Sequence, residues 1–188
     1  MIIGMVGLPR SGKSTFISKI MEQKNFAIVS RDDIRISLHG ERYLAPAEPM
    51  VKTISEIMFK SLIRSGCDIL LDEINLDRKS RQYWQKFSKD QIFWVHVNTD
   101  VDECIKRARK TIQLNLIPVI DSMNKGFMTP QKDEALLVTI NKHGNFSPDG
   151  YNILDVESIE EFMYEINSPN LSSWKKIIDE KYPDEIPY

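Results

Sequence analysis

Short apolar runs alternate along the chain with longer segments in which apolar residues recur every three or four positions. The short runs predict strands near residues 2–6, 26–29, 69–72, 92–97 and 135–141. The periodic segments predict helices near residues 13–23, 47–65, 77–89, 100–112 and 118–126, with one more near 157–167. Because strands that alternate with helices are typical of βαβ units, we expect an α/β fold with a mostly parallel five-stranded sheet between layers of helices.

The segment near 100–112 shows the clearest division into two sides. Its apolar stripe is expected to be buried and consists of Val101, Cys104, Ile105, Ala108 and Ile112. The opposite side is basic and is expected to be exposed, with Lys106, Arg107, Arg109 and Lys110.

A glycine-rich loop joins the first predicted strand to the first predicted helix. It fits G-x-x-x-x-G-K-[ST], a P-loop, in which glycines let consecutive backbone N–H groups curl around a phosphate. The expected nucleotide contacts come from Gly7, Leu8, Pro9, Arg10, Ser11, Gly12, Lys13, Ser14 and Thr15. Lys13 would bridge the β- and γ-phosphates of ATP, and Ser14 would coordinate Mg²⁺. The alternative is an ordinary glycine turn with a surface lysine, which the strand, loop and helix context disfavours.

The second predicted strand ends at Ser30-Arg31-Asp32-Asp33-Ile34-Arg35. Open α/β sheets bind ligands at the carboxyl ends of strands, and a carboxylate there can accept a proton from an attacking hydroxyl. The alternative is a helix N-cap, in which Ser30 or Asp32 begins a short helix and the arginines pair locally. Two acids flanked by two arginines exceed what a cap requires, so the pattern favours an acceptor site.

A second polar segment follows the third predicted strand. The motifs of the chain now comprise Arg31-Asp32-Asp33-Ile34-Arg35, Glu73-Ile74-Asn75-Leu76, Arg81 with Trp84, Lys106-Arg107, and residues 118–123. In this order they resemble the kinase domain of phage polynucleotide 5′-hydroxyl kinases, within the zeta-toxin and polynucleotide kinase-like group of small P-loop kinases. The resemblance covers about residues 1–128. It implies a three-layer P-loop NTPase fold with a helical lid, and the use of ATP and Mg²⁺.

The resemblance also implies roles for side chains at the acceptor site. Asp32 matches the general base, and Arg35 matches an arginine that orients the acceptor. Glu73 stands where the polynucleotide kinases have an aspartate, so this chain departs from the family by one methylene. Asp72 could offer the carboxylate instead, and Asn75 belongs to the same substrate-binding motif.

In the lid, Arg107 matches the first family arginine, which stabilises charge on the transferring phosphoryl group. The second lid arginine falls at Thr111, and Arg109 or Lys110 could replace it. The alternative for Arg107 is a surface ion pair with Glu103, four residues earlier on the helix.

Length and charge add limits on organisation and partners. At 188 residues the chain fits one domain, expected as a kinase domain over 1–167 with a lid near 107–128, and a tail over 168–188 packed on the same domain. The net charge is −2. Nine acids and three lysines give residues 155–188 a charge of −6, which leaves +4 for residues 1–154 and suits phosphate-bearing ligands.

The two cysteines, Cys67 and Cys104, provide no disulfide framework, which favours a cytoplasmic setting. The longest apolar stretches, 69–71 and 92–97, are far shorter than the ~20 residues of a bilayer span, so no membrane partner is expected.

Together these features predict an ATP-dependent kinase that moves the γ-phosphate to a hydroxyl, with a polynucleotide 5′-OH as the favoured acceptor. A small-molecule or modified-nucleotide kinase of the same fold is the first alternative. A non-catalytic ATP-binding module is the second, and the intact 31–35 motif disfavours it.

Overall fold

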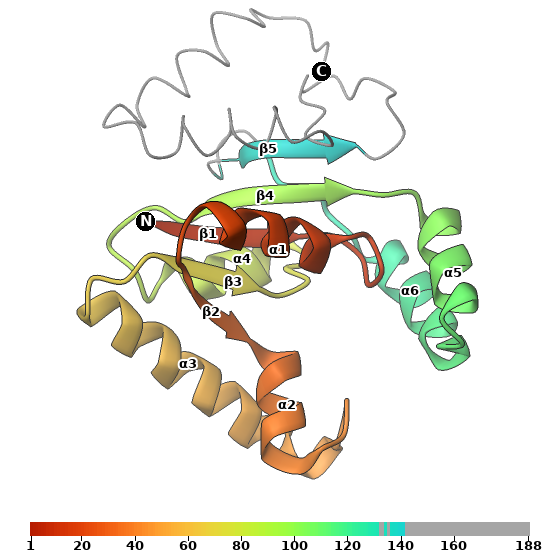
Figure 1. Ribbon diagram of the computed structural model, residues 1–188, viewed down its shortest axis with the longest axis horizontal. Helices are drawn as coiled ribbons and strands as arrows, with labels where there is room; N and C mark the ends of the chain where they lie inside the picture. Colours follow the sequence, from red (N-terminus) through yellow and green to blue (C-terminus); the bar gives the residue numbers. More distant parts are fainter. Residues whose placement is uncertain (132–133, 135, 142–188) are drawn as a thin grey trace, which may run out of the picture.

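The computed structural model describes residues 1–131, 134 and 136–141, which form an α/β fold around a parallel sheet (Figure 1). The strands are β1 Ile2–Val6, β2 Ala27–Ser30, β3 Ile69–Asp72, β4 Phe93–Asn98 and β5 Leu136–Asn141. Their order in the sheet is β2-β3-β1-β4-β5, and every neighbouring pair is parallel. The expected α/β class with a parallel sheet is therefore confirmed.

The connections between strands are helical. The helices are α1 Lys13–Gln23, α2 Arg31–His39, α3 Glu48–Arg64, α4 Arg78–Gln85, α5 Val101–Lys110 and α6 Ile117–Lys125, with 3₁₀ turns η1 Ala45–Ala47 and η2 Leu114–Leu116. The helix predicted near 157–167 and the tail over 168–188 lie outside the described residues. No helix in the described part of the chain is both long and apolar enough to span a bilayer.

Helices cover both faces of the sheet because neighbouring side chains of a strand point to opposite faces. On one face, Ile3 of β1 belongs to a buried cluster with Phe16 of α1. On the other face, Ile2 of β1 lies in a second cluster with Phe59 of α3 and Trp84 of α4. β1 is buried along its whole length, so the loop that follows it starts from a fully buried strand.

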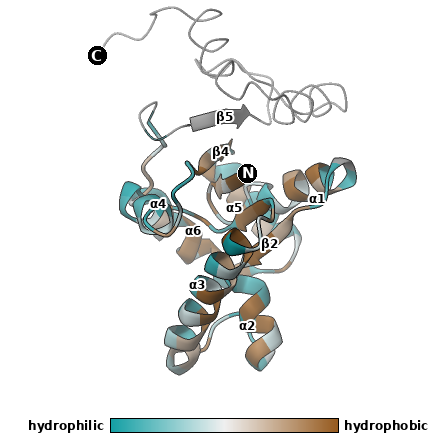
Figure 2. Cartoon of the chain, turned by 90° about the vertical axis from the view of Figure 1, so that its left-hand side faces the viewer, coloured by the Kyte–Doolittle hydropathy of each residue, from teal (hydrophilic) through white to brown (hydrophobic). Residues whose placement is uncertain are grey.

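Helix α2 is an element that the apolar pattern did not predict as a separate helix. The Ser30 hydroxyl accepts a hydrogen bond from the backbone N–H of Asp33 at 3.2 Å, and Asp32 and Asp33 occupy the first turn. Gly40 ends the helix in the left-handed conformation, with φ 77°. The N-cap interpretation of Ser30 is thus correct, and it leaves Asp32 on the exposed side of the first turn. Figure 2 shows α2 and α3 projecting together from one side of the sheet.

Helices α5 and α6 pack against each other and against the loop after β1. Cys104 and Ala108 of α5, Ile120 of α6 and Leu8 form one buried cluster. The predicted apolar stripe is wrong at Ile112, which lies beyond the end of α5 with φ 57° and is 85% exposed. Because the helix stops at Lys110, Ile112 no longer follows the helical period.

Candidate active site

The carboxyl ends of β1, β2 and β3 bring three of the predicted segments to one edge of the sheet. Ser30 at the end of β2 lies in register with Asp72 at the end of β3. The backbone N–H of Gly7, after β1, donates to the carbonyl of Ile74, after β3, at 3.2 Å. The strand arrowheads in Figure 1 point to the side of the molecule where α5 and α6 lie. The P-loop, the 31–35 motif and the 72–75 segment are therefore neighbours, as the sequence predicts.

The P-loop needs its two glycines for backbone conformation. Gly7 has φ 151°, and a Cβ there would lie 2.8 Å from both the Ser11 hydroxyl and the Val97 carbonyl. Gly12, at the N-cap of α1, has φ 113°. A side chain at either position would strain the loop, and at Gly7 it would also collide with its surroundings.

Lys13 lies half-buried over the loop that it follows. Its Nζ donates to the carbonyls of Gly7 and Leu8, each at 2.9 Å. Burial lowers the pKa of Lys13, while the negative charge of nearby Asp72 acts in the opposite direction. The interpretation of Lys13 as an ordinary surface lysine is therefore wrong, because the amine is held inside the loop.

The P-loop residues suit a bound triphosphate. Ser11 is 1% exposed, and among the described residues nothing hydrogen-bonds its buried hydroxyl. Ser14 and Thr15, in the first turn of α1, are exposed, and the N-terminus of this helix carries partial positive charge. The described residues include no cluster of three or more His, Cys, Asp or Glu that could hold a metal. Ser14 would coordinate a magnesium ion together with phosphate oxygens of the nucleotide.

The segment after β2 and the start of α3 form a three-residue network. Arg35 donates to Asp32 at 2.6 Å and makes two hydrogen bonds, each 2.8 Å, to the carboxylate of Glu48 in the first turn of α3. The paired hydrogen bonds to Glu48 raise the pKa of Arg35, so it remains a cation. The side chain of Asp32 is 80% exposed. Glu48 was not predicted as part of the site. The sequence around it indicates only the start of a helix, and this does not predict a partner on another helix.

Glu73 lies behind this network, in a mostly buried position. Arg31 faces Glu73, with Nε 3.3 Å from Oε1, and also donates to the hydroxyl of Ser55 at 3.3 Å. The guanidinium lies over the ring of Trp84, 5.2 Å from its centroid. Desolvation raises the pKa of Glu73 to about 7, against the opposing effect of Arg31. Asp72 is also half-buried, and burial raises its pKa.

The raised pKa of Glu73 predicts a pH dependence of stability. Folding favours the protonated form, so this stabilisation is complete below about pH 4.5 and is lost as the pH rises through about 7. Glu73→Gln mimics the neutral carboxyl. Wild type should lose stability relative to Glu73→Gln as the pH rises. We expect the difference between their free energies of unfolding to change by about 1–3 kcal/mol, in favour of the variant, from about pH 5 to about pH 8. Denaturant unfolding at stepped pH measures this, with Glu41→Gln in the exposed loop after α2 as control. A pH-independent difference would contradict the prediction.

Asn75 and Arg81 belong to the scaffold of the site. Asn75 is 4% exposed, and its amide donates to the Met5 carbonyl in β1 at 2.8 Å. The fully buried Arg81 donates to the carbonyls of Asn75 and Met128, at 3.0 and 2.9 Å, and pairs with Glu134. These hydrogen bonds fix the loop after β3, and the substrate contact expected for Asn75 stays a prediction.

Arg107 is half-buried, which corrects the expectation that it lies on the exposed side of its helix. Its Nε donates to Glu103 at 2.9 Å, so the ion pair considered as an alternative is present. Its Nη1 also donates to the backbone carbonyls of Arg10 and Ser11, at 3.1 and 2.9 Å. The guanidinium therefore contacts the P-loop itself, which a surface ion pair does not require.

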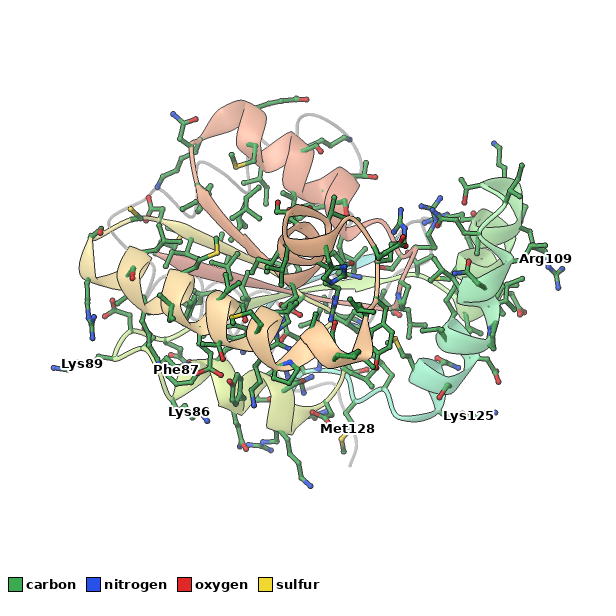
Figure 3. The ribbon with its side chains drawn as sticks, turned by 90° about the horizontal axis from the view of Figure 1, so that it is seen from below. Lys86, Phe87, Lys89, Arg109, Lys125 and Met128 are labelled. Atoms are coloured by element: carbon green, nitrogen blue, oxygen red, sulfur yellow. The ribbon has the colours of Figure 1, made fainter. Side chains whose placement is uncertain are left out.

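The position of the second lid arginine is a helix end in this chain. Thr111 is the C-cap of α5, and its hydroxyl donates to the carbonyls of Arg107 and Ala108. Arg109 and Lys110 are exposed, and Figure 3 shows Arg109 pointing outward from α5.

Comparisons with known proteins agree with this geometry. A family model described as an AAA domain matches residues 2–111. The chain is similar to a chain in the structure of the Pnkp1/Rnl/Hen1 complex, with a TM-score of 0.53 and 25% identity over 56% of this chain. The match spans only 38% of that longer chain. No curated protein matches.

Two further solved structures are similar over nearly the whole chain. APE1195 has a TM-score of 0.63 and 14% identity, with 95% of this chain and 96% of that chain covered. A gluconokinase from Sinorhizobium meliloti 1021 has a TM-score of 0.56 and 13% identity, with 96% and 95% covered. At these identities the two likenesses show the fold alone.

Proposed function

The chain belongs to the AAA domain family, and from that membership and the site geometry we propose that it is an ATP-dependent kinase whose acceptor is a polynucleotide 5′-hydroxyl. The observation that carries the proposal is the convergence of a P-loop lysine, an exposed carboxylate paired with an arginine, and two half-buried carboxyl groups at one edge of the sheet. A nucleotide-binding module without an acceptor has no need for the Asp32 and Arg35 pair.

In this proposal each side chain has a distinct task. Asp32 takes the proton of the acceptor hydroxyl. The hydroxyl oxygen bonds to the γ-phosphorus, while the bond from that phosphorus to the β–γ bridging oxygen breaks and ADP leaves. Arg35 orients the acceptor, and Lys13 and Arg107 stabilise negative charge on the transferring group. MgATP, when bound, supplies the phosphoryl group and neutralises part of its charge. Asp72 and Glu73 line the floor of the acceptor site.

Support for a polynucleotide acceptor comes from the 31–35 and 73–76 motifs, which resemble polynucleotide kinases, and from the 25% identity to a chain of the Pnkp1/Rnl/Hen1 complex. A small-molecule kinase remains the second candidate because the gluconokinase shares the fold. We also propose that the kinase domain spans residues 1–167 with a lid near 107–128. A cytoplasmic setting is part of the proposal, supported by the two free cysteines, Cys67 and Cys104.

The deciding experiment is transfer of radiolabelled γ-phosphate to a panel of acceptors. The panel contains DNA and RNA oligonucleotides with a 5′-hydroxyl, nucleoside 3′-monophosphates, free nucleosides and sugar acids such as gluconate. Label on the 5′ end of an oligonucleotide, at a higher kcat/KM than on any small acceptor, supports the proposal. Preference for a small hydroxyl metabolite would replace it with the second candidate.

Asp32→Asn tests the proton acceptor. We expect turnover to fall by about 10²-fold or more, because the variant lacks the proposed proton acceptor. ATP affinity should change little, because Asp32 pairs with Arg35 and not with the P-loop. Glu48 still holds Arg35 by two hydrogen bonds, so the guanidinium keeps its place. Steady-state kinetics beside ATP titration measure both quantities. Asp33→Asn is the matched control, and a larger loss there would move the base by one residue.

A further inference from the structure

A basic and aromatic surface runs along α3 and α4, on the part of the molecule that the proposed reaction does not use. We define it as the α3–α4 surface, made of Lys52, Lys60, Tyr83, Lys86 and Phe87. In Figure 3, Lys86, Phe87 and the nearby Lys89 lie at one side of the molecule, and Lys125 lies at the other.

Lysine ammonium groups lie over both aromatic rings of this surface. The Nζ of Lys86 lies 4.1 Å from the ring centroid of Tyr83 and 4.9 Å from that of Phe87. Lys52 lies 5.0 Å from the Tyr83 ring, and Lys60 lies 4.2 Å from the Phe87 ring. The rings meet edge to face at 5.2 Å, and both are half-buried. Each ring thus packs against the other and has two lysine ammonium groups near it.

Positive charge predominates on this surface. Glu56 of α3 is the acidic side chain that faces it: it accepts a hydrogen bond from the Tyr83 hydroxyl and lies 3.7 Å from Lys60. Lys52, Lys60 and Lys86 together lower the pKa of Glu56, in addition to the larger effect of Tyr83. Three lysines therefore surround one carboxylate, and the excess positive charge suits a polyanion.

The surface is linked to the acceptor side of the site through Trp84, which is 2% exposed and contacts residues of both. Arg31, in the first turn of α2, lies over Trp84 and hydrogen-bonds Ser55 of α3. Trp84 in turn contacts the Tyr83 ring edge to face, at 5.6 Å between centroids. From there the α3–α4 surface follows α3 between Lys52 and Lys60, a length of about 12 Å at the helical rise of 1.5 Å per residue. An acceptor chain whose 5′ end lies near Asp32 would meet Arg31 and then this surface.

We propose that the α3–α4 surface binds the single-stranded part of the acceptor downstream of its 5′ end, an inference that rests on the proposed polynucleotide kinase function. Lysines would contact backbone phosphates, and Tyr83 and Phe87 would offer ring faces or edges to bases. Basic side chains interleaved with aromatic rings are how proteins bind single strands without sequence preference. A merely solvated helix face would show the same lysines but no dependence on acceptor length.

The test separates the surface from the reaction by comparing acceptors of different length. Wild-type protein is assayed with a nucleoside 3′-monophosphate, a dinucleotide and a 12-nucleotide strand, each with a 5′-hydroxyl. Binding of a fluorescent 12-nucleotide strand is measured by anisotropy at several salt concentrations. We expect KM to fall with length, whereas equal KM values with intact transfer would overturn the inference and leave the proposed function standing.

Two variants then locate the binding. The double variant Lys60→Ala/Lys86→Ala should weaken binding of the 12-nucleotide strand roughly tenfold and reduce the slope of log affinity against log salt by about 1.4, with no change for the monophosphate. Phe87→Leu keeps an apolar side chain against Trp84 and should weaken binding about tenfold through lost stacking. The control is Lys19→Ala/Lys125→Ala, which removes equal charge from other surfaces.

Each remaining outcome also decides the question. Equal losses in the test and control variants would mean nonspecific attraction and would overturn the inference. Binding of anionic lipid vesicles in preference to the strand would assign the surface to another partner and overturn it as well. If no polynucleotide accepts phosphate, the proposed function is wrong, and absence of strand binding in the anisotropy assay then rejects the surface independently.

Discussion

Lys13→Ala is expected to lose phosphoryl transfer by about 10³-fold or more, because a preorganised cation at the transferring phosphate stabilises the transition state strongly. The half-buried amine donates to the carbonyls of Gly7 and Leu8, so its removal also costs two hydrogen bonds. Removal also relieves the desolvation that lowers the pKa of Lys13, so the net change in the free energy of unfolding should be small.

Steady-state transfer beside thermal melting measures the two effects separately. Lys19→Ala, on the same helix, is the matched control and should keep wild-type turnover. A folded Lys13→Ala protein that transfers phosphate at near wild-type rate would refute the phosphate-loop assignment.

Arg107→Ala is expected to cut turnover by about 10³- to 10⁵-fold, the range attributed to arginines that reach a transferring phosphoryl group. Its Nη1 donates to the carbonyls of Arg10 and Ser11, so the guanidinium already lies at the P-loop. Those contacts also mean that the variant should be less stable by about 1–3 kcal/mol, the worth of hydrogen bonds from a charged group.

Because stability and turnover change together, the controls are needed to separate them. Glu103→Gln weakens the ion pair on α5 and keeps Arg107, so it should lower stability slightly and leave turnover within a few-fold. Arg109→Ala and Lys110→Ala remove exposed charges and test whether either replaces the lid arginine absent at Thr111. If turnover in all four variants merely follows their melting temperatures, Arg107 is a structural residue and its lid role is wrong.

The elements that could be predicted from the sequence are those with a strong local period. The observed bounds of β1, β3 and α1 equal the predicted ranges, because a buried strand and an amphipathic helix each repeat a simple pattern. Helix α2 was not predicted from the apolar pattern, because only Ile34 among its nine residues is buried and the helix therefore has no apolar stripe. Its signal was chemical, namely the Ser30 cap and two acids in the first turn.

Part of the candidate site could likewise be predicted from the sequence, and part of it depends on how separate elements pack. Motif spacing predicted that the P-loop and the segments after β2 and β3 would be neighbours, since the carboxyl ends of parallel strands meet at one edge. It could not predict that Arg35 pairs with Glu48, or that Arg107 contacts the loop carbonyls, since both depend on how separate helices pack. The motif also suggests substrate contact for Asn75, which stays a prediction, whereas its hydrogen bond to Met5 of β1 could not be predicted from the sequence.

The contact between Arg81 and Glu134 bears on where this domain can be cut. The two side chains, 1% and 7% exposed, form paired hydrogen bonds of 2.9 Å, and they tie α4 to the chain just before β5. A fragment trimmed to the family match at residue 111 would lack both Glu134 and the Met128 carbonyl, which are partners of the Arg81 guanidinium. Breaking a buried pair costs about 3–5 kcal/mol, a large share of the roughly 5–15 kcal/mol that stabilises a whole domain. We therefore expect a minimal fragment of this domain to be more stable when it extends through Glu134 than when it ends at residue 111, the end of the family match.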